Sequence, residues 1–68
     1  MKIEEINHNL GKLVHYTDEF RLLDHDFRFN ACTKRATVNG VVYEAELQSP
    51  TAKGSVLIVP LEEVQVIS

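Results

Sequence analysis

The sequence contains a single cysteine, Cys32, among its 68 residues. One cysteine cannot form a disulfide within the chain, and the several closely spaced cysteines of zinc ribbons and zinc knuckles are missing. Domains of this size bury only about 60% of the surface of the unfolded chain. Many of them therefore depend on disulfides, a metal ion or a partner subunit. Without a disulfide or a zinc site, this domain must owe its stability to a well-packed core or to self-association.

Long apolar runs are also missing. The longest one, residues 56–59, is far shorter than the roughly 20 residues that cross a bilayer. Residues 1–5 carry no apolar stretch behind the basic Lys2, so we expect no signal peptide. Together with the free thiol, this predicts a cytoplasmic protein that does not enter a membrane.

An excess of positive charge is absent, since the formal net charge is −3. Dedicated nucleic-acid-binding domains usually show a basic surface, so the overall charge argues against that class. The hydrophobic (44%) and charged (25%) fractions are those of a folded globular protein. We therefore expect one folded domain over residues 1–68.

The strongest local pattern is the dipeptide Asn39-Gly40, which is typical of a two-residue type I′ turn because both residues tolerate a positive φ. From Tyr43 to Leu47, apolar residues alternate with glutamates, which predicts a half-buried strand. Residues 33–38 supply the other arm of this central hairpin.

Upstream of the hairpin, residues 27–31 also alternate, which places Phe27, Phe29 and Ala31 on the inner face. If the same alternation of inward and outward residues continued along the strand, Arg35 would be buried and Val38 exposed. One extra residue reverses every later side chain, so we expect a bulge between Ala31 and Ala36, with a kink near residues 32–34.

Downstream, residues 55–59 form a continuous run typical of a strand buried on both sides, and Pro60 should end it. Residues 61–64 then predict one helical turn and residues 65–67 a last short strand. Seven residues are expected to form the core: Phe29, Tyr43, Ala45, Leu47, Ile58, Val64 and Val66.

The first third of the chain allows two interpretations. Residues 11–16 and 20–23 favour a hairpin, whereas the alternative is a short helix that begins at Asp18 and is capped by Thr17. Residues 2–9 are spaced either for a helical turn that Gly11 would end or for a flanking strand.

The order of these elements over residues 33–67 resembles the SH3-like small barrels. Residues 42–47 are similar to the aromatic-x-Ala strand of Tudor-type domains, and residues 54–59 resemble the G-x-V-x-V strand that follows it. Residues 60–62 depart from the acidic and asparagine positions beside the Tudor ligand cage. The resemblance therefore implies a fold: all-β, a small SH3-like barrel of about five strands with one short helical turn near residues 60–64.

Two side-chain patterns could carry chemistry. Asp24-His25-Asp26 could bind a divalent ion with His8 or His15, but neighbouring residues of an extended segment point in opposite directions and the segment also suits a polar turn. A Cys32–His pair could act as nucleophile and base, yet nothing around Cys32 suggests an activated thiol. No phosphate-binding or hydrolase motif occurs. We expect no metal, no cofactor and no enzymatic activity.

Cations interleaved with aromatic residues offer a possible platform for single-stranded RNA or DNA, in which phosphates bind the cations and bases stack on the rings. The candidate residues are Arg21, Arg28, Lys34, Arg35 and Tyr16. The opposing interpretation assigns the phenylalanines between them to the core.

The leading expectation is a small protein-interaction module or an accessory or regulatory subunit. Its partner would be another protein or a second copy of this chain, and a weak single-stranded nucleic-acid-binding barrel is the alternative. An outward Ile67 and its neighbour Gln65 on the last strand, with the acidic face of Glu44 and Glu46, are the candidate contact residues.

Overall fold

The computed structural model describes residues 1–52 and 54–67, most of which form strands. The elements in chain order are a 3-10 turn η1 (Ile3–Glu5), the helix α1 (Ile6–Asn9), the strands β1 (Leu13–Asp18), β2 (Leu23–Thr37), β3 (Gly40–Gln48) and β4 (Val56–Pro60), a second 3-10 turn η2 (Leu61–Glu63), and β5 (Gln65–Val66). The expectation of a mainly β protein is confirmed. Among the described residues, no helix is long and apolar enough to cross a membrane.

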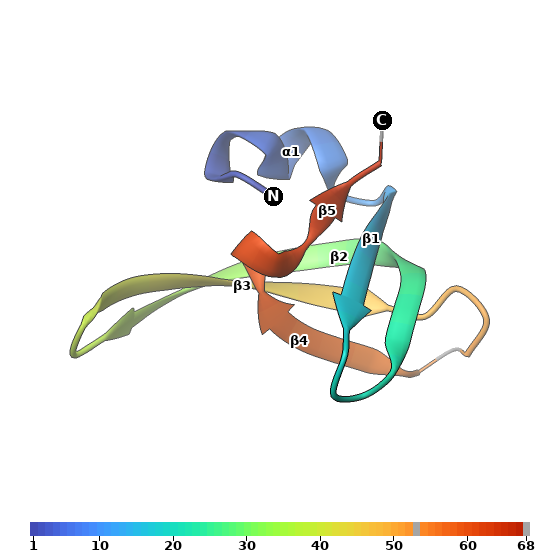
Figure 1. Cartoon of the computed structure of the whole chain (residues 1–68). Coiled ribbons are helices and arrows are strands. Elements are labelled where there is room, and N and C mark those ends of the chain that lie inside the picture. Colours follow the sequence, from blue (N-terminus) through green and yellow to red (C-terminus); the bar gives the residue numbers. More distant parts are fainter. Residues whose placement is uncertain (53, 68) are drawn as a thin grey trace.

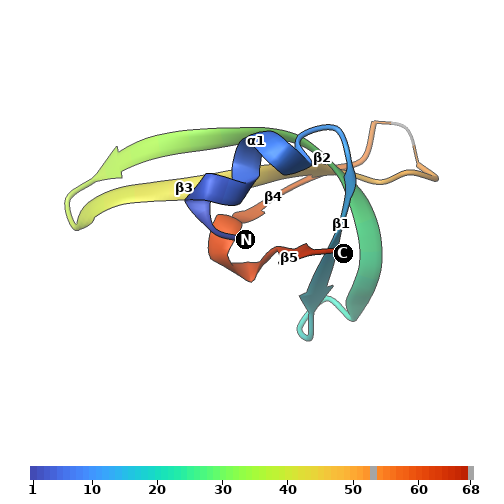
Figure 2. The ribbon, with the colours of Figure 1, turned by 90° about the horizontal axis from the view of Figure 1, so that it is seen from above.

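All five strands belong to one antiparallel sheet in the order β4-β3-β2-β1-β5. The long strand β2 is the shared element, because its first part pairs with β1 and its second part pairs with β3. The sheet curves around the core, and the β2–β3 hairpin extends well beyond it (Figures 1 and 2). The sheet is not closed, since β4 and β5 form its two edges.

The first third of the chain is the predicted hairpin, formed by β1 and β2, and the alternative helix from Asp18 is wrong. Asp18 instead caps the tight turn, because its carboxylate accepts hydrogen bonds from the backbone N–H groups of Phe20 and Arg21. Leu22 closes the turn at a φ of 55°. Residues 3–9 take the helical alternative, and Gly11 follows them at a φ of 81°.

The bulge in β2 lies earlier than predicted. The register with β3 shifts between Phe29 and Ala31, at Asn30, and not between Ala31 and Ala36. The Phe29 backbone still exchanges hydrogen bonds with the segment before β1, since it donates to Lys12 and accepts from Gly11. The extra residue therefore falls where β2 leaves β1 and continues with β3 alone. A bulge there bends the strand and increases its twist. It also places Ala31 opposite Glu46 and Cys32 opposite the buried Ala45, so the prediction that Ala31 lies on the inner face is wrong.

The central hairpin is confirmed, but its turn is not the predicted type I′. Thr37 and Gly40 are paired, so Val38 and Asn39 are the two loop residues. A type I′ turn needs a positive φ at both, whereas among the described residues only Gly40 of this turn has one, at 125°. The Thr37 hydroxyl adds support by donating to the Gly40 carbonyl oxygen over 2.9 Å.

The core lies inside the curved sheet and includes four of the seven predicted residues, while Tyr43 is half-buried against it. Ile58 and Val66 are corrections: their exposed fractions are 56% and 37%. The single sheet packs on the core with one face only, and on β4 that face carries Leu57 and Val59. The prediction that this strand is buried on both sides is therefore wrong. The buried apolar residues are Val14, Tyr16, Phe27, Phe29, Ala45, Leu47, Val59, Leu61 and Val64.

Candidate functional site

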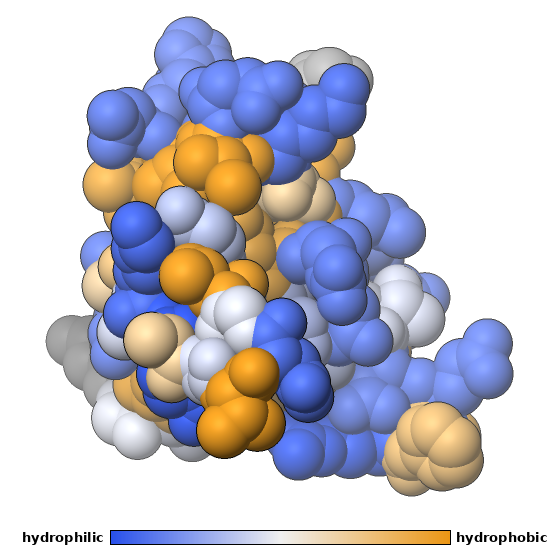
Figure 3. Space-filling view, turned by 90° about the vertical axis from the view of Figure 1, so that its left-hand side faces the viewer, coloured by the Kyte–Doolittle hydropathy of each residue, from blue (hydrophilic) through white to orange (hydrophobic). Residues whose placement is uncertain are grey.

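A groove of about 590 Å³ lies at the base of the projecting hairpin. Three segments far apart in the sequence line it, namely residues 1–4, 41–44 and 60–62, together with Arg35. We call it the hairpin groove. Its volume falls within the usual range of ligand-binding clefts. On the side of the molecule toward which the hairpin projects, apolar side chains are gathered between polar ones (Figure 3).

Strand alternation and one proline position the walls of the hairpin groove. Val41 and Tyr43 point to the inner face of β3, as Ala45 and Leu47 do, but they lie beyond the part of the sheet that covers the core. Pro60 ends β4, and η2 then places the buried Leu61 at the bottom of the groove.

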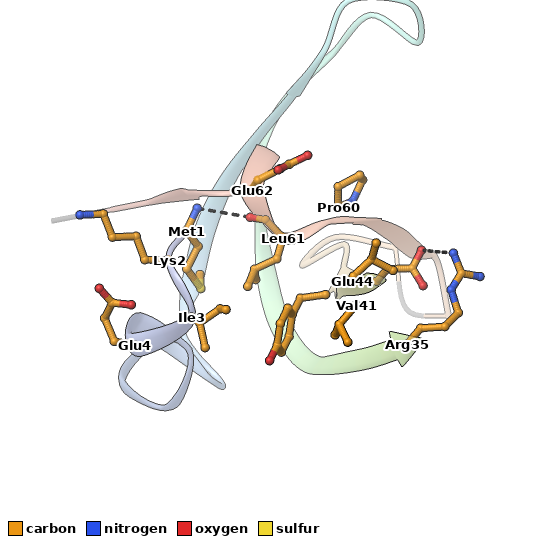
Figure 4. A pocket seen from close by; sticks show the side chains of 12 residues that line it. Met1, Lys2, Ile3, Glu4, Arg35, Val41, Glu44, Pro60, Leu61 and Glu62 are labelled. Carbon is orange, nitrogen blue, oxygen red and sulfur yellow. Dashed lines mark hydrogen bonds and ion pairs between the residues drawn. The ribbon is translucent and has the colours of Figure 1, made fainter. Parts of the chain in front are cut away.

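The N-terminal segment forms the opposite wall. The Met1 amino group donates hydrogen bonds to the carbonyl oxygens of Leu61, over 3.3 Å, and of Val64. Met1 packs partly buried against the core, while Ile3 remains largely exposed. Figure 4 shows Met1, Ile3, Leu61 and Val41 around the same hollow. The groove is therefore apolar in its centre.

Charged side chains stand at the two ends of the hairpin groove. At the hairpin end, Arg35 and Glu44 form an ion pair with an N–O distance of 3.6 Å. At the other end lie Lys2 and Glu4, and Glu62 stands above the groove next to Pro60 (Figure 4). Within residues 1–52 and 54–67, Glu4 and Glu62 belong to no ion pair. The Lys2 and Met1 ammonium groups balance these two carboxylates, so this end of the groove is close to neutral overall.

The backbone of β3 is also incompletely paired beside the groove. β4 pairs with β3 only from Glu44 to Gln48, because Pro60 lies opposite Glu44. Gly40 to Tyr43 therefore have β2 on one side and, in the described part of the chain, no strand on the other.

The direction of the free backbone groups follows from the ladder. In an antiparallel pair, every second residue exchanges N–H···O bonds with one neighbour, and the residues between them face the other neighbour. The Ser49 N–H donates to the Ser55 carbonyl oxygen over 3.1 Å, at the end of the β3–β4 ladder. Every second residue before Ser49 along β3 faces the same side as Ser49, and these residues include Tyr43 and Val41. The N–H and C=O groups of these two residues therefore face the line along which β4 would continue.

The predicted protein-contact residues do not form one surface. Gln65 pairs with His15 at one edge of the sheet, and Ile67 follows β5 with an exposed side chain. Glu44 and Glu46 are half-buried on β3, which β1 and β2 separate from β5. Of these four residues, only Glu44 lines the hairpin groove.

The predicted nucleic-acid residues are also dispersed. Arg21 lies in the turn before β2, whereas Lys34 and Arg35 lie near the far end of that long strand. Arg28, between them, donates to the Gly11 carbonyl oxygen over 2.7 Å. Tyr16 is only 5% exposed, and Phe27 and Phe29 are buried with it in the core. Phe20, beside Arg21 in the turn, is a fully exposed ring, but the other three cations lie elsewhere along β2. The structure thus does not gather these cations and exposed rings on one surface.

The segment Asp24-His25-Asp26 contacts His15 across the ladder. The imidazole Nε2 lies 2.6 Å from Asp24 Oδ1, and Nδ1 lies 2.8 Å from Asp26 Oδ1. Hydrogen bonds to Asp26 and then to Asp24 raise the pKa of His15 above its usual 6.5, because both stabilise the imidazolium form. In the described ranges, no group of three or more His, Cys, Asp or Glu side chains is arranged to hold a metal ion.

Cys32 is half-buried on β2, opposite Ala45, and packs against the core. Burial raises the pKa of its thiol, because the thiolate loses hydration there. This is the opposite of the lowered pKa that activates a nucleophilic cysteine.

Comparisons with models of protein families, with curated proteins and with solved structures found no match to this chain. The candidate site therefore stands on its own geometry. Sequence reasoning missed the hairpin groove because its walls meet only in the folded chain. The apolar Ile3 and Ile6 were a partial signal, since they lie on a segment whose apolar side needs something to cover it.

Proposed function

We propose that this chain is a protein-interaction module, a small accessory or regulatory subunit that binds a partner protein in the hairpin groove. The observation that carries the proposal is the open apolar groove next to an unpaired stretch of β3. Exposed apolar surface that is bordered by polar residues is typical of interaction sites. Val41 and Ile3, on opposite walls, are both more than half exposed.

The shape of the hairpin groove favours a protein partner over a small metabolite. Apolar side chains are also exposed on the hairpin itself, at Val42 and at the fully exposed Val38 of its tip. Small-molecule sites usually enclose most of the ligand surface, whereas Val41 and Ile3, which line this groove, are more than half exposed.

A selection experiment tests this proposal. Linear twelve-residue peptides from a random displayed library are selected on the immobilised protein, and their affinities are measured by calorimetry. Val41→Glu places a charge in the groove and should weaken binding at least about tenfold, as expected for a central contact residue. Val56→Glu is the matched control, because Val56 has a similar exposed fraction (46% against 52% for Val41) but lies on β4 outside the groove. Selected peptides that bind both variants equally well would refute the proposal.

We also infer that the five strands form the small barrel of SH3-like domains. Three features support this inference: the strand order, the long bent β2 that both halves of the sheet share, and the 3-10 turn between β4 and β5. Nuclear Overhauser contacts between side chains of β4 and β5 would test whether the two edges approach each other. The half-buried Cys32 thiol suits the reducing cytoplasm that the sequence predicts.

A further inference from the structure

The β3 edge beside the hairpin groove presents backbone groups that match one kind of ligand. Val41 and Tyr43 each direct an N–H donor and a C=O acceptor to the open side, two residues apart on the strand. An extended polypeptide carries donors and acceptors at the same spacing. A helix cannot match this edge, because its backbone groups bond within the helix.

The side chains around this edge add a second requirement. On the inner face of β3, Val41 and Tyr43 border the apolar centre of the hairpin groove, together with Ile3 and Leu61. An added strand would turn every second side chain toward that centre. Those side chains should be apolar, and the residues between them would face solvent.

Charge complementarity gives a third requirement. Glu4 lies at the end of the hairpin groove away from Arg35, Glu62 stands above the groove, and the Arg35–Glu44 ion pair largely neutralises the hairpin end. The chain as a whole carries a net charge of −3. A basic side chain in the partner that lies directly beside the Glu62 carboxylate would gain a local attraction, which the nearby Met1 ammonium group partly offsets.

We infer that the hairpin groove binds an extended segment of a partner protein, which continues the sheet beyond Pro60 by pairing with the backbone of Val41 and Tyr43. The segment alternates apolar and polar residues and carries a basic residue beside Glu62. This inference rests on the proposed function and specifies how that function is carried out. Strand addition of this kind obtains affinity from main-chain hydrogen bonds and specificity from alternate side chains.

Amide hydrogen exchange in the ¹⁵N-labelled protein tests the geometry. In the free protein, the Val41 and Tyr43 amides should exchange fast, while the Val42 and Glu44 amides, which face β2, should be protected. Adding a peptide selected as above should protect Val41 and Tyr43 selectively. Binding without protection of these two amides would overturn the inference, even if Val41→Glu still abolished binding and the proposed function stood.

N-methylation of the bound peptide, one residue at a time, gives an independent test. Methylation should weaken binding about tenfold at every second position, where an N–H faces β3, and have little effect at the positions between. An effect without this alternation would exclude strand addition. Glu62→Gln should weaken a basic peptide about threefold, the size expected of an exposed ion pair, and an unchanged affinity would remove the charge requirement.

The remaining alternative occupant is a second copy of the chain. Sedimentation of the protein alone at increasing concentration, with hydrogen exchange on the same samples, distinguishes the two. Self-association that protects Val41 and Tyr43 without any peptide would overturn the assignment to a partner protein. A monomer whose two amides stay unprotected is the expected result.

Discussion

The Nδ1 atom of His15 lies 2.8 Å from the Oδ1 atom of Asp26, its direct partner across the ladder between β1 and β2. Asp24 occupies the other ring nitrogen, so the imidazole bridges two carboxylates of the same strand. Thr17, which is paired with Asp24, completes this polar cluster through its hydroxyl. The cluster ties the two strands of the first hairpin together on their solvent face.

This contact predicts a stability that falls as the pH rises. The pKa of His15 is raised above 6.5 in the folded state by Asp26 and Asp24, so the folded protein holds the proton more tightly than the unfolded chain does. The stabilisation is complete below about pH 6.5 and is lost as the pH rises through the raised pKa. Urea unfolding between pH 5.5 and pH 8 should show this decrease, and His15→Gln should flatten it. His8→Gln, on α1, is the control and should keep the decrease.

The two phenylalanines Phe29 and Phe20 should differ sharply in their effect on stability. Phe29 is completely buried, and Phe29→Ala should cost about 3–5 kcal/mol. A small domain has little more than about 5 kcal/mol in total, so this variant should be largely unfolded. Phe20 is fully exposed in the turn, and Phe20→Ala should change the unfolding midpoint very little. Circular dichroism during thermal melting measures both, and a Phe29→Ala melt at the parent temperature would contradict the assigned core.

Gly40→Ala tests the turn of the central hairpin. A Cβ atom at this position would meet no atom within 4 Å, so the cost is one of backbone conformation alone. A φ of 125° is rarely adopted by residues with a side chain, and the strain should reduce the unfolding free energy by about 1–3 kcal/mol. Val38→Ala, at the exposed tip, should be neutral. Equal stability of both variants would mean that the turn adopts another conformation in solution.

The Cys32 thiol should react slowly. Its raised pKa and its partial burial both lower the concentration of accessible thiolate near pH 8. Labelling with Ellman's reagent, followed by absorbance, should be several-fold slower in the native protein than in urea. Equal rates in the two conditions would show that β2 opens easily at this position.

Local alternation in the sequence was sufficient to predict the hairpins and the inward residues Phe27, Phe29, Ala45 and Leu47, because each of these patterns depends only on neighbouring residues. It failed at Ala31, because the bulge at Asn30 reverses the faces beyond it, and it failed where no alternation exists. In the uniformly apolar β4, nothing in the sequence distinguishes the face of Ile58 from the face of Val59. Which face is buried depends on the register with β3, a tertiary property.

The position of the bulge could not be predicted for a related reason. The sequence showed that the alternation of residues 27–31 conflicts with that of residues 36–38, so a bulge was needed. Its position at Asn30, however, depends on where the pairing of β1 with β2 ends. The hairpin groove depends on contacts between residues still farther apart in the sequence, since the Met1 amino group donates hydrogen bonds to the carbonyl oxygens of Leu61 and Val64 at the opposite end of the chain. No pattern within one segment encodes such a meeting.

Because β4 stops at Pro60 while β3 runs on to Gly40, the edge of the sheet has a step. A strand that pairs with the free part of β3 would meet the ring of Pro60 at one end and the hairpin tip at the other. It can neither slide past the step nor grow along the whole edge. The step would thus limit an added strand to a few residues and fix its register. It would also oppose the open-ended addition of further copies that leads to fibrils.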